Sequence, residues 1–405
     1  MTVSTVLSAA EGDRLARKNA FVLSAAQALY GSSATIIITL GGLVGHMLAD
    51  DKSLATLPIT SFVLGTAVIT VPASLFMRVV GRRIGFMTGA SFGVASGALG
   101  VYAIFAQSFW LFCLATLLCG GYQAFAMYYR FAAADTASDA FKAKAISWVL
   151  VGGVVAAVAG PQIVIWTRGT FDPVMFAGSF AASMVLAIAA FALLSFIDIP
   201  RPSETVFSQP ARRLGEILAQ PRLLVAMACG MVSYGIMNLV MTATPLAMVA
   251  CDLSIEDAAF VIQWHALAMF APSFFTGNVI ARFGKERVIA VGLVLLAGCG
   301  AVALSGVDIA HFWAALVLLG LGWNFAFVGA TALVTDCYRP AERNKVQAVN
   351  DLAVFATVAF ASFSSGNLLH RIGWDAVATS LFPFVVLALG LVVWLSWHSK
   401  RRAAQ

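Results

Sequence analysis

The protein is a chain of 405 residues, of which 60% are hydrophobic and 11% charged, and its formal net charge is +6. Soluble domains carry about 25% charged residues, so this composition excludes an ordinary water-soluble protein and indicates one embedded in a membrane. The six cysteines show no spacing typical of a metal site, and we expect no metal, cofactor or disulfide.

Twelve apolar segments of about 20 residues follow one another along the chain, each long enough to cross a bilayer as a helix. None alternates with the period of two that is typical of membrane β-strands. We therefore expect an all-α integral membrane protein with twelve transmembrane helices. Four of these segments contain a proline that is able to kink a helix: Pro72, Pro161, Pro245 and Pro272. The expected helices are residues 20–43, 56–76, 85–105, 109–130, 145–166, 174–197, 223–249, 258–281, 288–306, 311–335, 346–369 and 376–397.

Lysine and arginine fall almost entirely on one side of this twelve-helix arrangement. That side carries 22 of them, whereas the other carries only Lys52, Arg168 and Arg371. By the positive-inside rule, the basic side is cytoplasmic and includes both termini. The first apolar run is too long for a signal peptide. We expect a multi-pass protein of the cell inner membrane, and no nucleic-acid partner.

A polar stretch rich in proline and charge, residues 198–222, separates the first six expected helices from the last six. It predicts an N-terminal six-helix bundle at residues 1–198, a cytoplasmic linker at 199–222 and a C-terminal six-helix bundle at 223–405.

Four features of the first half recur in the second half at offsets of 201 to 204 residues, in the same order. Because the offset spans six helices, the two halves have the same orientation and form a parallel repeat. The matches are Tyr30-Gly31 with Tyr234-Gly235, Gly81-Arg82 with Gly284-Lys285, Gly121-Tyr122-Gln123 with Gly322-Trp323-Asn324, and Asp135 and Lys144 with Asp336 and Lys345.

Two six-helix halves, a central linker and a basic glycine-containing loop after the second and eighth helices resemble the major facilitator superfamily (MFS). The family's loop pattern G-x-x-x-D-R-x-G-R-[KR] is kept only in part, with Arg78 and Ala281 where the aspartate is expected. Gly160-Pro161 resembles part of the antiporter motif of this family, without its trailing glycines. The resemblance implies a secondary transporter that works by alternating access.

In this family the first, fourth, seventh and tenth helices line a central cavity. An amide that faced lipid would leave its polar atoms unpaired, so we expect Gln123 and Asn324 to point into this cavity and to face each other. The alternative is that they join helices by hydrogen bonds. The residues that the resemblance places around the substrate are Tyr30, Tyr122, Gln123, Tyr234, Asn238, Trp323 and Asn324.

Arg130 lies two helical turns after Gln123, toward the cytoplasm. We expect it to pair with an acid in a cytoplasmic gate, although contact with an anionic solute is an alternative. His265 is the one histidine well inside an expected helix and a candidate for ion coupling, with helix packing as the alternative. The acids considered for the gate are Asp135, Asp139, Asp336 and Asp351.

The candidate cavity is rich in aromatic and amide groups and poor in charge, which suits a flat, polar, largely uncharged solute. The sequence is also similar overall to bacterial facilitators associated with riboflavin uptake, which implies a flavin or vitamin such as riboflavin. Gly160-Pro161 leaves efflux of amphipathic compounds open, and a non-transporting membrane sensor or assembly factor is another alternative. No nucleophile triad or phosphate loop indicates an enzyme, and we expect a monomer in the lipid bilayer.

Overall fold

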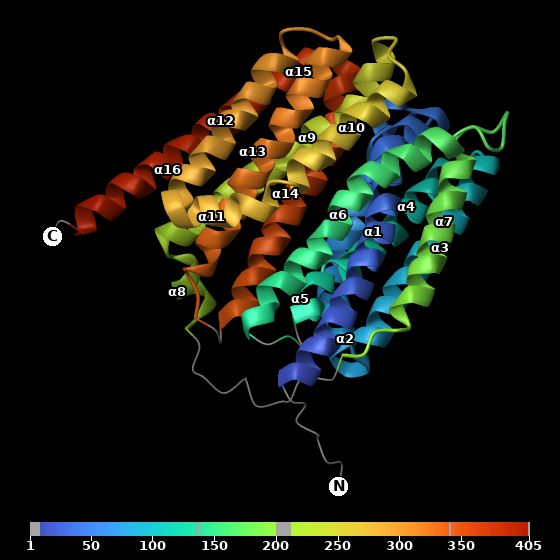
Figure 1. Ribbon diagram of the computed structural model, residues 1–405. Helices are drawn as coiled ribbons and strands as arrows, with labels where there is room; N and C mark the ends of the chain where they lie inside the picture. The colour runs from blue at the N-terminus through green and yellow to red at the C-terminus, as the bar shows by residue number, and fades with distance from the viewer. Residues whose placement is uncertain (1–8, 135–136, 138, 200–211, 340–341, 404–405) are drawn as a thin grey trace. The chain divides into compact units, whose positions relative to one another are not determined.

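The computed structural model describes residues 9–134, 137, 139–199, 212–339 and 342–403. Every regular element within these ranges is a helix, and they contain no β-strand (Figure 1). The all-α architecture expected from the apolar segments is confirmed.

Packing divides the chain into two compact units. Unit 1 consists of Met1–Ile37 and Val68–Ser203, and unit 2 consists of Ile38–Ala67 and Glu204–Gln405. The last change of unit, after Ser203, falls within the expected linker, but residues 38–67 group with the second unit. The division into bundles at 1–198 and 223–405 therefore stays a prediction.

Helices α1 and α2 contribute to both units, and each remaining helix belongs to one. The first group is α1 (Ala9–Leu48), α2 (Leu57–Val80), α3 (Arg82–Phe105), α4 (Phe109–Ala126), α5 (Tyr129–Ala134), α6 (Asp139–Thr167) and α7 (Ala177–Leu194). The second group is α8 (Leu214–Leu218), α9 (Pro221–Ala250), α10 (Ile255–Phe270), α11 (Ser273–Phe283), α12 (Lys285–Ala303), α13 (Ile309–Thr335), α14 (Arg343–Arg371), α15 (Trp374–Thr379) and α16 (Leu381–Ala403).

Within the described ranges, eleven spans are long and apolar enough to cross a membrane, and α10 with α11 forms a twelfth that is bent by 43°. All twelve expected segments coincide with these spans. The bend lies at Pro272, which has no N–H to donate to the preceding turn and whose ring clashes with it. The other three prolines lie inside the continuous helices α2, α6 and α9.

Glycines let neighbouring helices approach closely within each unit. In unit 1, a Cβ on Gly97 of α3 would lie 2.7 Å from the backbone Cα of Met184 on α7. In unit 2, a Cβ on Gly292 of α12 would clash with the backbone N of Ala326 on α13. A larger side chain at either position would force the two helices apart.

The segment that leads out of unit 1 is fastened to α1. The Asn19 side chain donates to the Asp198 carbonyl at 2.7 Å, and its oxygen accepts from the Asp198 backbone N–H at 3.1 Å. Asn19 is fully buried. Because both ends of the amide are used, Asp198 is held in place at the start of the expected linker.

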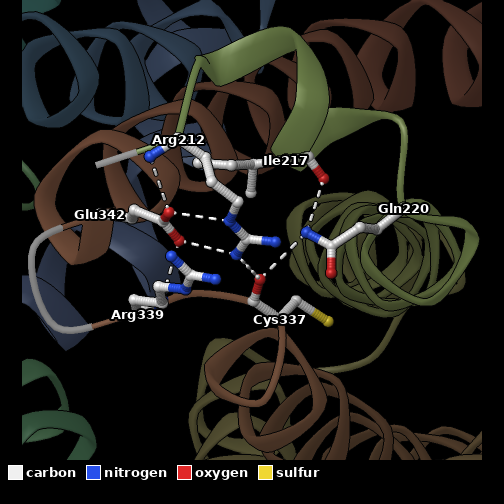
Figure 2. Close-up of polar contacts among 6 residues, drawn as sticks. All are labelled: Arg212, Ile217, Gln220, Cys337, Arg339 and Glu342. Atoms are coloured by element: carbon white, nitrogen blue, oxygen red, sulfur yellow. Dashed lines mark hydrogen bonds and ion pairs between the residues drawn. The ribbon is translucent and has the colours of Figure 1, made fainter. Parts of the chain in front are cut away.

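The segment that leads into unit 2 is fastened by an ion pair that joins Arg212 to Glu342 (Figure 2). The Arg212 Nε and Nη2 atoms donate to the two carboxylate oxygens of Glu342 at 2.8 and 2.7 Å. The backbone N–H groups of Arg212 and Arg339 donate to the same carboxylate. Arg212 and Gln220 also share the Cys337 carbonyl, at 3.2 and 3.0 Å. The linker end, the start of α9 and the α13–α14 loop thus form one hydrogen-bonded cluster.

The Glu342 side chain in this cluster is 0% exposed, whereas that of Arg212 keeps 29% of its surface exposed. Hydrogen bonds from Arg212 hold the pKa of the Glu342 carboxyl well below its usual range, with further help from the backbone N–H of Arg339. A buried carboxylate is tolerated when its acceptor sites are filled. Four N–H donors meet that requirement here.

Candidate functional site

In unit 1 the structure brings two of the expected cavity residues together. The Tyr30 ring of α1 meets the Tyr122 ring of α4 edge to face, with centroids 4.9 Å apart. Tyr122 is fully buried, and neither its hydroxyl nor that of Tyr129 has a partner of hydrogen-bonding geometry. Gln123, the next residue on α4, is half-buried. Their roles in solute binding stay a prediction.

In unit 2 four aromatic rings from three helices gather into one cluster, which we call the aromatic quartet. Tyr234 of α9 lies at its centre, with ring centroids 5.4 Å from Trp323, 5.0 Å from Phe327 and 6.2 Å from Phe355. The Trp323 and Phe327 rings on α13 stack at 5.1 Å with planes 14° apart. Edge and stacked geometries of this kind are favourable for aromatic pairs.

One polar atom inside the aromatic quartet has no partner. Trp323 is 9% exposed, and its Nε1–H is buried without a hydrogen-bond acceptor. Asn238, one turn after Tyr234 on α9, is also buried, and its Oδ1 accepts from Thr242 at 3.3 Å. A buried N–H without a partner costs about 1–3 kcal/mol. Trp323 is therefore able to gain a bond from an acceptor brought to this position.

Asn324 lies on another face of α13, where its amide contacts neighbouring helices, and its role in solute binding stays a prediction. Its side chain is 0% exposed, and both amide hydrogens are used, toward the Met269 carbonyl at 2.7 Å and Ser273 Oγ at 2.8 Å. Its oxygen accepts from Thr276 at 2.6 Å. Asn324 thus bridges α13 to both sides of the bend at Pro272, where the helical hydrogen bonds are interrupted. The helix-joining alternative describes its contacts.

His265 on α10 is buried and faces α13. Its Nδ1–H donates to the Leu316 carbonyl at 2.9 Å, while Nε2 has no partner. The backbone at His265 would lie 2.6 Å from a Cβ on Gly320, so the two helices are in close contact. These contacts match the packing alternative for this histidine, and its part in ion coupling stays a prediction.

Of the candidate gate acids, Asp336 at the end of α13 has its partners inside unit 2. It accepts hydrogen bonds from Lys285 at 2.5 Å and from Arg222 at 3.2 Å. Arg222 also pairs with Glu286 at 3.4 Å. The network joins the ends of α9, α12 and α13 within one unit.

The remaining gate candidates stay predictions. Arg130 on α5 is exposed, with its guanidinium 4.8 Å from the Phe131 ring centroid. Asp351 on α14 accepts from Asn350 at 3.1 Å and belongs to the other unit. Asp135 lies outside the described residues, as does the side chain of Asp139.

The sequence interpretation missed two members of the aromatic quartet, Phe327 and Phe355. Phe327 had a usable signal, because it follows Trp323 by four residues and so lies on the same helical face. Phe355 had none, since an apolar residue in an apolar helix carries no mark of the side it faces. Among the described residues no group of three or more potential metal ligands is present.

The sequence is similar to known transporters over nearly its whole length. The Riboflavin transporter RfnT of Brucella anthropi is 52% identical over 92% of this chain and 94% of its own. The uncharacterized MFS-type transporters YddS and YdeG of Bacillus subtilis are 28% and 29% identical, over 94% of this chain and 92% of each relative. Residues 226–405 match the family model of the Major Facilitator Superfamily. With the twelve membrane spans, these similarities show that the chain belongs to the major facilitator superfamily of secondary transporters.

Proposed function

We propose that this transporter carries riboflavin or a closely related flavin across the inner membrane by alternating access. The identity of 52% with RfnT over nearly the full length of both chains supports a shared solute. A shared fold alone would not support it, since one fold hosts many substrates.

The aromatic quartet is the observation in this chain that carries the proposal. The isoalloxazine of riboflavin is a flat ring system with carbonyl and ring-nitrogen acceptors along one edge. Stacked and edge-on rings at Tyr234, Trp323 and Phe327 provide walls that suit a flat ring. The unpaired Trp323 Nε1–H supplies a donor for one acceptor. Tyr30 and Tyr122 form a separate aromatic pair within unit 1.

Several finer assignments belong to the same proposal. The moving bodies are residues 1–198 and 223–405, joined by the linker at 199–222, and both termini are cytoplasmic, as the basic residues indicate. The protein works as a monomer and is not an enzyme. The gate involves Arg130 with the acids Asp135 and Asp351.

Riboflavin binding and flux provide the test. Purified protein is titrated with riboflavin, whose fluorescence falls on stacking, and riboflavin flux is followed in proteoliposomes. Trp323→Phe keeps a ring but removes the N–H, so affinity should fall about 2- to 10-fold, as for one net hydrogen bond. Trp323→Leu also removes the stacking ring and should weaken binding further.

The matched control is Trp313→Phe, on the same helix but outside the aromatic quartet. The Trp313 ring packs on Trp264, and the change should leave riboflavin affinity within twofold. Flux of a cationic dye without riboflavin flux would favour the efflux alternative. Absence of flux for both solutes in folded protein would favour a sensor or assembly factor.

The efflux alternative draws on Gly160-Pro161, and these residues have a packing role. A Cβ on Gly160 of α6 would lie 2.6 Å from Cβ of Thr35 on α1. The glycine therefore permits close contact between α1 and α6 within unit 1. No contact of Gly160 or Pro161 favours export over the flavin proposal.

A further inference from the structure

Unit 2 carries an apolar groove on the part of the bundle that follows the bend at Pro272. The groove has a volume of about 340 Å³ and lies between α11, α12 and α13. Its walls are apolar throughout, so Arg287 contributes the methylene groups of its side chain rather than its guanidinium. The lining residues are Val279, Phe283, Arg287, Val288, Val291 and Phe325.

The groove opens to the outside of the unit. Half of the Phe283 and Val291 surface is exposed, and Arg287 is exposed as well. These helices are membrane spans. Apolar walls of this kind do not suit a polar solute, because its donors and acceptors would have no partners there. They suit a hydrocarbon chain of a neighbouring lipid.

Around one end of the groove, the acidic side chains are paired with basic ones, whereas two arginines are not paired with an acid within the described part of the chain. Asp336 and Glu286 are already engaged, by Lys285 and Arg222. Arg282 holds its guanidinium 5.4 Å from the ring of Phe283, a groove residue. Among the described residues neither Arg282 nor Arg287 forms an ion pair with a carboxylate. Two guanidinium groups at the mouth of an apolar groove are thus open to an anion from outside the chain.

We propose that this groove is a binding site for an anionic phospholipid. One acyl chain lies against Val279, Phe283 and Val291, and the headgroup phosphate accepts hydrogen bonds from Arg282 and Arg287. A planar guanidinium suits a phosphate because it donates two parallel bonds. The methylene groups of the two arginines cover the apolar wall, and their guanidinium groups reach the phosphate. A single lipid therefore fills the apolar groove with its acyl chain and pairs with the arginines through its headgroup.

The site lies apart from the proposed flavin site. Most groove residues are on α11 and α12, whereas the aromatic quartet is on α9, α13 and α14. Phe325 of the groove is also on α13, but it is two residues from Trp323 and from Phe327, about 200° around the helix, and so lies on the opposite face. The lipid proposal can therefore be tested independently of the riboflavin proposal. Changes at Arg282 or Arg287 should leave riboflavin affinity in detergent unchanged.

Lipid retention measured on the full-length protein tests the site. The detergent-purified protein is titrated with phosphatidylglycerol or phosphatidylcholine, and bound lipid is counted by native mass spectrometry. We expect one phosphatidylglycerol to bind more tightly than phosphatidylcholine. Arg287→Gln should weaken that binding about fivefold, and the double change with Arg282→Gln about 25-fold, at roughly the strength of one basic residue each.

Two further variants separate a built site from general surface charge. Arg83→Gln removes a basic residue from the first turn of α3 in unit 1, which contributes no residue to the groove, and should leave the tightly bound lipid in place. Val291→Trp fills the groove without changing charge and should reduce retention of both lipids. Equal losses for Arg83→Gln and Arg287→Gln would overturn the proposal, as would binding without preference for phosphatidylglycerol.

Discussion

Replacement of Asn324 by leucine separates the two roles that a buried amide has in a membrane helix. Leucine has about the same volume but no polar atoms, so the change removes three hydrogen bonds to α10 and α11. The Thr276 hydroxyl keeps its bond to the Pro272 carbonyl. The Met269 carbonyl loses the amide donor at the bend.

The expected cost of Asn324→Leu follows from those contacts. A buried polar group left without a partner costs about 1–3 kcal/mol, and an interhelical hydrogen bond in a membrane protein contributes about 0.6 kcal/mol. The Met269 carbonyl and the two other lost bonds together give a loss of about 2–4 kcal/mol. Because the amide does not face the proposed solute site, riboflavin affinity should stay within about twofold of the original value.

Thermal unfolding and riboflavin titration of the same detergent preparation measure both quantities. Asn278→Leu is the matched control, because this asparagine is exposed on α11. The control should leave thermal stability nearly unchanged. If Asn324→Leu instead kept its stability and lost riboflavin binding, the amide would be a solute contact and the bridging role assigned to it would be refuted.

Three other outcomes are expected. Because the pKa of the Glu342 carboxyl is lowered in the folded protein, its contribution to stability is present above the ordinary carboxyl pKa of 4.5 and is lost as pH falls below it. The thermal stability difference between the original protein and Glu342→Gln should therefore be largest near neutral pH and shrink in acid, and a gap that widened in acid would contradict this linkage. Gly97→Leu should lower the yield of monodisperse protein, since its Cβ meets Met184, whereas Gly390→Leu on α16, with nothing within 4 Å, should not; equal yields would refute the close contact. Reporter fusions at residues 82 and 285 should read cytoplasmic and those at 51 and 308 external, and inversion of either half would refute the topology.

The positions of the spans were predictable because a bilayer imposes a length and an apolar composition on every crossing helix. The bend in the eighth span was predictable in kind, since Pro272 removes a backbone donor. Its consequence was not, because nothing in the sequence connects Pro272 to an asparagine 52 residues later. That pairing depends on which helices are neighbours.

In the candidate site, the rotation of α13 about its own axis was not predictable from the sequence. A soluble helix has a polar side that fixes its rotation, but α13 is apolar nearly all round. Trp323 and Asn324 are about 100° apart on such a helix, and composition does not decide which of them faces a neighbouring helix. The sequence interpretation chose the amide for the solute, whereas the structure uses it to join α13 to the bend between α10 and α11.

The ion pair of Arg212 and Glu342 was also missed, for a related reason. The two residues are 130 positions apart, and each lies in a polar loop that looks like ordinary solvated chain. A carboxylate in such a loop is usually exposed. Only the folded arrangement of the α13–α14 loop against the end of the linker makes Glu342 the buried centre of four donors.

The hydrogen bonds that hold Asp198 and Arg212 limit the length of the connection between the two halves. Composition suggests a free segment of 24 residues, 199–222, but the last part of it is tied down at Arg212. The remaining steps from Asp198 to Arg212 span at most roughly 50 Å of fully stretched chain, at 3.3–3.6 Å per residue. If Arg212 were released, the next anchor would be Gln220, and the connecting segment would become longer although the number of residues in the chain stays the same. The anchors, rather than the number of linker residues, thus set the widest separation that the connection permits.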